Sequence, residues 1–135
     1  MIADKLMRTT VLMALILALA LFSGCGSREH LVTASDNEGE VRLQNGEALV
    51  IRLESNPTTG YSWQVTEIDN AMLVQDGDPA YKQSPGNDGL AGAGGEETIR
   101  FKALGSGRTT LMLGYMRPWE DLPPLQTFRI QVVVE

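Results

Sequence analysis

The 135-residue chain contains one cysteine and one histidine, and aromatic residues make up only 6% of it. A single cysteine excludes an internal disulfide. Zinc sites require clustered histidine and cysteine side chains, which this composition does not supply. We therefore expect no metal and no other cofactor.

Residues suited to catalysis are equally scarce. The only histidine, His30, lies where the folded domain should begin, and no nucleophile-elbow sequence accompanies it to suggest a Ser-His-acid triad. Two acidic pairs, Glu96-Glu97 and Glu120-Asp121, are adjacent strand or loop residues, which are usually solvated. The chain is not expected to be an enzyme, and carboxylate catalysis by these pairs is the only catalytic alternative left open.

Basic residues are in the minority, with 11 Lys and Arg against 17 Asp and Glu, which gives a net charge of −6. They form no basic run or cluster. Binding to nucleic acid therefore lacks its electrostatic basis, and no nucleic-acid partner is expected. Adhesion to anionic lipid is likewise not expected, except through a covalent anchor.

The long apolar run of the chain lies near its start, from Val11 to Phe22, after a basic beginning. It is too short for an ordinary transmembrane helix and has the layout of a secretory signal peptide. Ser23-Gly24-Cys25 then resembles a lipoprotein-processing site, at which the cysteine becomes the first mature residue and carries lipid. Lipidation would also remove the liability of an unpaired thiol in an exported protein.

We therefore expect residues 1–24 to be a lipoprotein-type signal peptide and residues 25–29 to be a lipid-anchored tether. The protein would be exported and anchored to the cell envelope, facing the membrane or periplasm, with Cys25 as its lipidation site. The alternative is an uncleaved anchor that ends in a free thiol.

Residues 30–135 show a repeated alternation of apolar and polar side chains, as in Leu49-Ile51-Leu53, with Gly, Pro or Asn between the segments. We find no convincing helical stripe and no internal repeat. This pattern predicts one all-β domain, an antiparallel β-sandwich of about seven to eight strands. The expected strand segments are 30–35, 41–43, 49–54, 61–65, 98–103, 111–115 and 127–134.

The segment from Asp76 to Gly95 breaks the alternation, because it is rich in glycine and contains Pro79 and Pro85. It is predicted to be a long loop, which is either functional or an inert connection. Its end lacks the spacing and the Lys-Ser/Thr of a phosphate-binding loop. The small residues there would instead let backbone amides approach another surface; they are Gly92, Ala93, Gly94 and Gly95.

Two further turns carry unusual side chains. One is Asn56-Pro57-Thr58-Thr59-Gly60-Tyr61, and the other is Arg117-Pro118-Trp119. A large aromatic residue in a turn suggests surface intended for a partner, although Trp119 could instead fold back as a core plug. Arg117 could merely pair with Glu120 or Asp121. Trp63, on an alternating strand face, is expected in the core.

These three segments, in this order, resemble the NPTTG, GxGG and RPW/F signatures of the chagasin-like inhibitors of papain-type cysteine peptidases. The resemblance covers about His30 to Glu135. It implies an immunoglobulin-like β-sandwich whose three loops lie side by side and enter the peptidase cleft. Asn56 to Gly60 would be the central loop, flanked on either side by the other two. The departure from the family pattern is the long, proline-containing lead from Tyr81 to Leu90.

The resemblance implies a reversible protein inhibitor, with Thr58 and Thr59 near the catalytic Cys and His of a papain-like cysteine peptidase. Pro57 fixes its own φ, so the central turn should be rigid before binding. We expect a monomer that meets the membrane only through lipid on Cys25, in a bacterial or archaeal lipoprotein form of the family. The alternative is a non-inhibitory envelope module that uses the same loops for a peptide, glycan or protein ligand.

Overall fold

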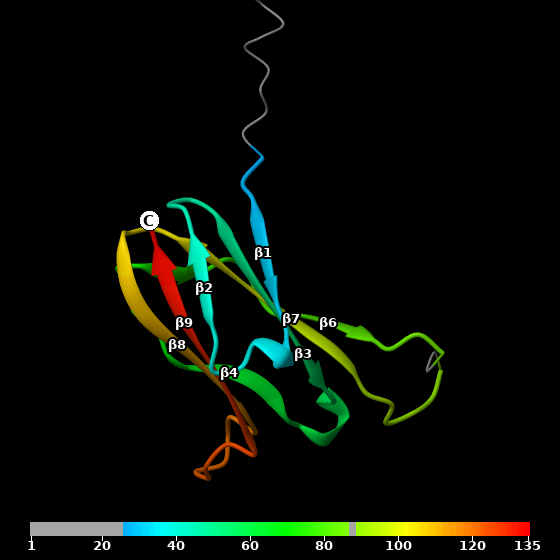
Figure 1. The fold of residues 1–135 in the computed structure, drawn as a ribbon. Helices are drawn as coiled ribbons and strands as arrows, with labels where there is room; N and C mark the ends of the chain where they lie inside the picture. The colour runs from blue at the N-terminus through cyan, green and yellow to red at the C-terminus, as the bar shows by residue number, and fades with distance from the viewer. Residues whose placement is uncertain (1–25, 87–88) are drawn as a thin grey trace, which may run out of the picture.

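The computed structural model describes residues 26–86 and 89–135, so the predicted signal peptide and Cys25 lie outside the described residues. Within them, nine strands form two sheets that pack into a sandwich (Figure 1). One sheet has the order β1-β3-β7-β5, with β6 also paired to β7, and the other has the order β2-β9-β8-β4. The strands are β1 Glu29–Val32, β2 Glu40–Leu43, β3 Ala48–Ser55, β4 Ser62–Glu67, β5 Leu73–Gln75, β6 Ala80–Gln83, β7 Gly95–Ala103, β8 Gly107–Met116 and β9 Gln126–Val134. Two short 3₁₀ helices are η1 Ala34–Asp36 and η2 Pro57–Thr59.

The predicted all-β sandwich is confirmed, with nine strands in place of seven or eight. Most strand pairs are antiparallel, but β1 pairs with β3, and β2 with β9, in parallel. The parallel pairs arise because the chain leaves the first sheet after β1 and joins the edge of the second sheet as β2.

The apolar alternation predicted from the sequence forms the core. Leu49 and Ile51 of β3 are fully buried, as are Phe101 of β7 and Leu113 of β8. Trp63 is 5% exposed and belongs to the same cluster, as expected. This cluster contains residues from Val32 to Val134, so both sheets contribute to one hydrophobic core.

The first predicted strand is wrong at its end. Strand β1 stops at Val32, and the next residues form η1 instead of continuing to Ser35. The backbone N–H of Thr33 donates to Oδ2 of Asp36 at 2.8 Å. This is half of a capping box, in which the acidic side chain reaches back to the start of the turn and ends the extended conformation.

The predicted long loop from Asp76 to Gly95 is also partly wrong. Residues 80–83 form β6, which pairs antiparallel with the start of β7, Ala80 opposite Thr98 and Gln83 opposite Gly95. Pairing with a neighbouring strand outweighs the weak local pattern here. Gly95 is therefore a buried strand residue, and a Cβ there would lie 2.2 Å from the carbonyl oxygen of Lys82.

The two ends of the sandwich are far apart. Glu29, at the start of β1, lies opposite Ala48, at the start of β3, and β3 then runs to Ser55, where the first predicted loop begins. Seven strand steps correspond to about 23 Å. Figure 1 places the start of β1 and the C-terminus at one end, and the segment between β8 and β9 at the other. The chain therefore enters the domain at the end opposite the loops.

None of the helices among the described residues is long and apolar enough to cross a bilayer.

Candidate functional site

The first loop is a closed turn. Its backbone bends through η2, where the N–H of Gly60 donates to the carbonyl of Pro57 at 2.9 Å. Gly60 has a φ of 80°, a conformation that favours glycine. The Thr58 hydroxyl donates to Oδ1 of Asn56, and the Thr59 hydroxyl to the Asn56 carbonyl, both at 2.6 Å. Each threonine thus uses its single hydroxyl proton inside the turn, and the exposed oxygen can only accept a bond from a partner.

The stems of this loop are tied to the core by polar groups. The backbone N–H of Asn56 donates to the Tyr115 hydroxyl at 2.8 Å. Oε2 of Glu97 accepts bonds from the Ser55 hydroxyl at 3.0 Å and from the Trp63 N–H at 3.2 Å. Glu97 is only 6% exposed, so the expectation that both members of its acidic pair are solvated is wrong. It faces the interior because the alternation of β7 points it there.

The second loop is attached to the first by a side chain. Nδ2 of Asn56 donates to the carbonyl of Gly92 at 3.0 Å. Gly94 lies against the same corner, since a Cβ there would be 3.6 Å from the Ser55 carbonyl oxygen. Gly92, Ala93 and Gly94 are the part of the predicted segment that remains a loop, because Gly95 opens β7.

The third loop is attached to the first through Arg117. Its Nε donates to the carbonyl of Thr59 at 2.9 Å, and its guanidinium carbon lies 4.5 Å from the centre of the Tyr61 ring. Nη1 also contacts Oε1 of Glu120 at 3.1 Å, the pairing considered from the sequence. The arginine is therefore committed to internal contacts, with about one third of its side chain exposed.

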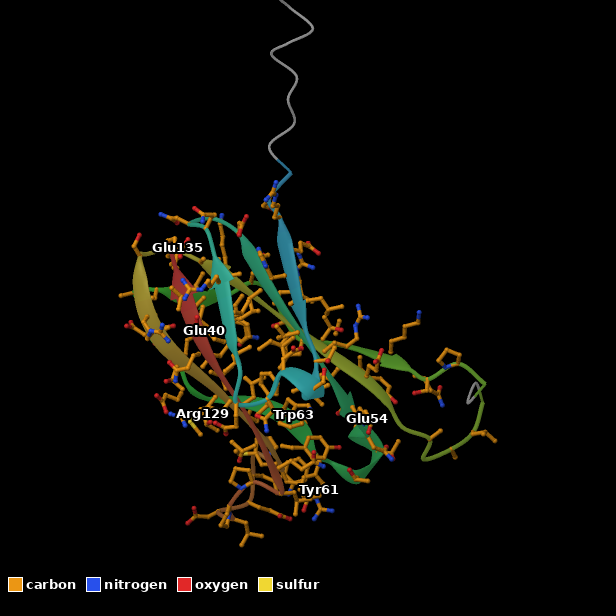
Figure 2. All side chains as sticks on the ribbon, in the orientation of Figure 1. Glu40, Glu54, Tyr61, Trp63, Arg129 and Glu135 are labelled. Atoms are coloured by element: carbon orange, nitrogen blue, oxygen red, sulfur yellow. The ribbon has the colours of Figure 1, made fainter. Side chains whose placement is uncertain are left out.

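Trp119 lies over the first loop and faces solvent. Its side chain is 69% exposed, which excludes the core-plug alternative. A Cβ built on Gly60 would lie 2.6 Å from Cη2 of Trp119, so the edge of the indole covers the position at which Gly60 has no side chain. Side chains and backbone of all three loops thus meet at one pole of the sandwich, where Figure 2 labels Tyr61, with Trp63 deeper inside.

The comparison with known families decides which kind of protein carries this arrangement. The model of the chagasin family of peptidase inhibitors, I42, matches residues 42–132. The chain belongs to this family. It is therefore a reversible inhibitor of papain-like cysteine peptidases and not an enzyme.

Curated relatives and a solved structure agree with the assignment. Amoebiasin-2 of Entamoeba histolytica is 33% identical over 107 residues, which cover 78% of this chain and 85% of the relative. Chagasin of Trypanosoma cruzi is 34% identical over 96 residues, which cover 67% and 83%. A crystal structure of a cysteine protease inhibitor from Entamoeba histolytica superposes with a TM-score of 0.71 and 29% identity, covering 83% of this chain and all of that one. The fold of this chagasin-family inhibitor is thus immunoglobulin-like.

Two important residues of the site were missed by sequence reasoning, Tyr115 and Glu97. The Tyr115 ring packs at a tilt against the rings of both Trp63 and Tyr61, with centroid separations of 5.2 and 5.5 Å. The signal for Tyr115 was available, because a buried tyrosine hydroxyl must find a polar partner. A burial signal for Glu97 was available too, since β7 alternates strictly, but the identity of its partners depends on how the two sheets pack.

The groups at this pole are suited to recognition of a partner. A hollow of about 350 Å³ lies between the loop stems, and backbone, serine and amide groups contribute to its lining, including Ser55, Asn56, Gly94 and Gln126. His30 is in β1, near the other end of the sandwich, where Nε2 contacts Oε2 of Glu47 at 2.8 Å. Within residues 26–86 and 89–135, no cluster of three or more His, Cys, Asp or Glu side chains suited to a metal ion is found.

Proposed function

We propose that this chagasin-family inhibitor blocks its target by inserting the first loop, Asn56–Gly60, into the active-site cleft. The Gly92–Gly94 loop would rest on one side of the cleft and Arg117–Trp119 on the other, with Tyr61 supporting the base. The observation that carries this proposal is the direct bonding of both outer loops to the first one, through Asn56 and Arg117. This network joins the three loops into one continuous surface.

The internal bonding of the first loop explains why it would obstruct a peptidase without being consumed. A peptidase cleaves a segment that adopts an extended conformation in its cleft, whereas η2 is a closed turn held by the Asn56 and Thr58 side chains. A loop already fixed in its bound shape loses little conformational entropy on docking. Trp119 adds the large exposed aromatic surface that is typical of an interface hot spot.

Enzyme kinetics test this function. A protein that begins at Gly26 should inhibit papain competitively with respect to a peptide substrate, and activity should return on dilution. Unchanged papain activity at high micromolar inhibitor would contradict the proposal and favour the envelope-module alternative. Progressive cleavage of the first loop would identify a substrate and also contradict it.

We also propose that the inhibitor is the lipoprotein form expected from its N-terminus, monomeric and anchored to a bacterial or archaeal envelope through Cys25. The position of the chain entry supports this, because β1 starts at Glu29, at the end of the sandwich opposite the loops. An anchor at Cys25 would direct the loops away from the membrane. The wild-type protein should incorporate labelled palmitate, and Cys25→Ser should not. Cys25→Ser should also be found in the soluble fraction and not in the membrane fraction. Equal labelling of the two proteins would contradict the anchor.

A further inference from the structure

The stems of the first loop belong to different sheets. The loop leaves β3, which pairs with β1 and β7, and enters β4, which pairs with β8. The two stems therefore share no backbone ladder, unlike the stems of an ordinary β-hairpin. Something other than strand pairing must fix the distance between them.

The indole N–H of Trp63, on β4, joins the stems directly by donating to the Glu54 carbonyl of β3 at 2.9 Å. A single buried carboxylate oxygen joins them a second time. Oε2 of Glu97, on β7, accepts the Ser55 hydroxyl at 3.0 Å from one stem and the Trp63 N–H at 3.2 Å from the other. Ser55 directly precedes Asn56, and Trp63 follows Tyr61 by two residues. Glu97 thus links both sheets directly beneath the loop.

A buried carboxylate at position 97 is not expected to raise the free energy of unfolding above that of an apolar side chain. Removing a charge from water is costly, and an apolar side chain of similar volume often serves a core as well or better. Hydrogen bonds to a charged acceptor are, however, short, directional and stronger than those between neutral groups. The arrangement therefore favours a role in fixing geometry.

We propose that Glu97 is a positioning residue for inhibition. It holds the stems at Ser55 and Trp63 at the separation that the closed turn of the first loop requires. This inference rests on the proposed function of that loop. Without the carboxylate, the free inhibitor spends less time in the binding-competent conformation, and the apparent affinity falls by that fraction.

Binding kinetics with papain test the proposal. Glu97→Leu should associate at least tenfold more slowly than the wild type, while its dissociation changes less, because docking restores the loop. Glu97→Gln keeps one acceptor oxygen and should lie between the two, and Ser55→Ala, which removes one of the two bonds, should do the same.

A control separates positioning from a general loss of stability. Val134 is 2% exposed and lies at the end of β9, near the C-terminus and away from the loops. Val134→Ala should lower the free energy of unfolding and leave association with papain unchanged at a temperature where it is folded. The proposal is overturned if folded Glu97 variants associate at the wild-type rate, or no more slowly than Val134→Ala at matched stability. Should Glu97→Leu fail to fold, Glu97→Gln and Ser55→Ala carry the same comparison.

A second measurement needs no peptidase, and so separates failure of this proposal from failure of the proposed function. In the free inhibitor, amide hydrogen exchange at Asn56, Gly60 and Trp63 should be at least tenfold faster in Glu97→Leu than in the wild type, and faster by a smaller factor in Glu97→Gln and Ser55→Ala. Exchange at Leu113, in the core strand β8, should be unchanged. Equal exchange at the loop amides would overturn the positioning role even if the wild type proves an excellent inhibitor.

Discussion

Glycine is required at position 60 for two reasons, its backbone conformation and its contact with Trp119. Gly46 shares only the first reason and serves as a matched control. Its φ is 80°, and the Trp119 indole covers the position of a Cβ. Gly46 has a φ of 88° with no atom within 4 Å of such a Cβ. A left-handed conformation costs a non-glycine residue about 1–2 kcal/mol in either place. Only at Gly60 should a methyl group also displace Trp119 from the first loop.

We predict that Gly60→Ala weakens inhibition of papain about tenfold or more, while Gly46→Ala lowers the free energy of unfolding and leaves the inhibition constant unchanged. Inhibition constants and urea unfolding of both variants check this. Equal inhibition by the two variants would contradict the coupling of Gly60 to Trp119.

Trp119 should contribute to binding and not to folding, because its side chain is 69% exposed. We predict that Trp119→Ala weakens inhibition by about 2 kcal/mol or more, roughly thirtyfold, with little change in the free energy of unfolding. Leu104→Ala, which truncates an apolar side chain that is 44% exposed just after β7, is the control and should inhibit normally. A wild-type inhibition constant for Trp119→Ala would remove this residue from the interface.

At the scale of elements, the third loop is held to the first by the fixed geometry of Arg117. Its Nε contacts the Thr59 carbonyl, its Nη1 contacts Glu120, and its guanidinium plane covers Tyr61. Lysine keeps the charge but cannot make these contacts together.

We predict that Arg117→Lys weakens inhibition by about 1 kcal/mol, or about fivefold, since the pair is only partly buried. Arg108→Lys, which alters the pairing with Glu40 near the start of β8, at the opposite end of that strand from Arg117, is the control and should inhibit as the wild type does. If the two variants inhibit equally well, the arginine bridge does not determine the position of the third loop.

The sequence was most informative where one element decides the outcome. Alternation alone placed Trp63 in the core, and the glycine and proline positions located the turns around Gly60 and Pro118. It was least informative where contacts between segments far apart in the chain determine the structure. Strand β6 exists because the start of β7 offers it a partner, and Glu97 is buried with two particular donors because two sheets meet above it. The contacts that join the three loops, such as Asn56 to Gly92, likewise depend on the assembled sandwich.

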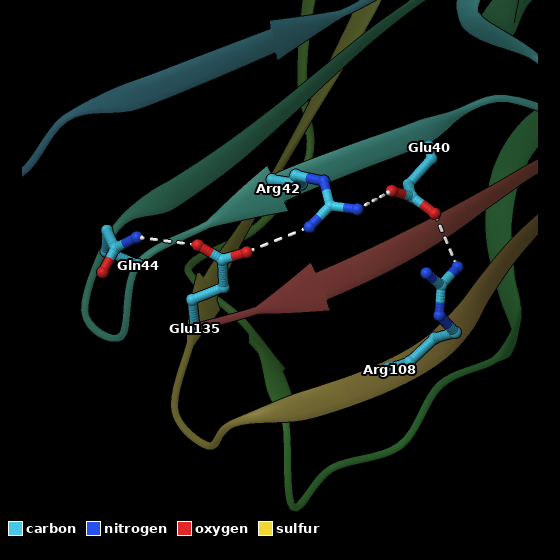
Figure 3. Close-up of polar contacts among 5 residues, drawn as sticks. All are labelled: Glu40, Arg42, Gln44, Arg108 and Glu135. Atoms are coloured by element: carbon cyan, nitrogen blue, oxygen red, sulfur yellow. Dashed lines mark hydrogen bonds and ion pairs between the residues drawn. The ribbon is translucent and has the colours of Figure 1, made fainter.

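At the scale of the whole molecule, the outer face of the β2-β9-β8 sheet carries a chain of charges (Figure 3). Arg42 contacts Glu40 at 2.9 Å and Glu135 at 3.0 Å, and Arg108 contacts the other oxygen of Glu40. The hydrogen bond from Arg108, with a smaller contribution from Arg42, holds the pKa of Glu40 below its ordinary value of 4.5. This network links β2 to β8 through Arg108 and to the end of β9 through Glu135.

A lowered folded-state pKa determines the direction of the pH effect. The stabilisation is present above about 4.5, the value in the unfolded chain, and is lost as the pH falls through the lower folded-state value. Urea unfolding at pH 7 and pH 3.5 should therefore show a smaller acid-induced loss of stability for Glu40→Gln than for the wild type. An identical loss in both proteins would mean that the network does not contribute to acid sensitivity.

The central claim is that the joined loops occupy the catalytic cleft of a papain-like peptidase. The most direct test is the rate at which iodoacetamide alkylates the active-site thiol of papain. We predict that one equivalent of the protein beginning at Gly26 slows alkylation at least a hundredfold and that Trp119→Ala, at the same concentration, protects less. Alkylation at the rate of free papain, with the inhibitor in excess, would contradict the account.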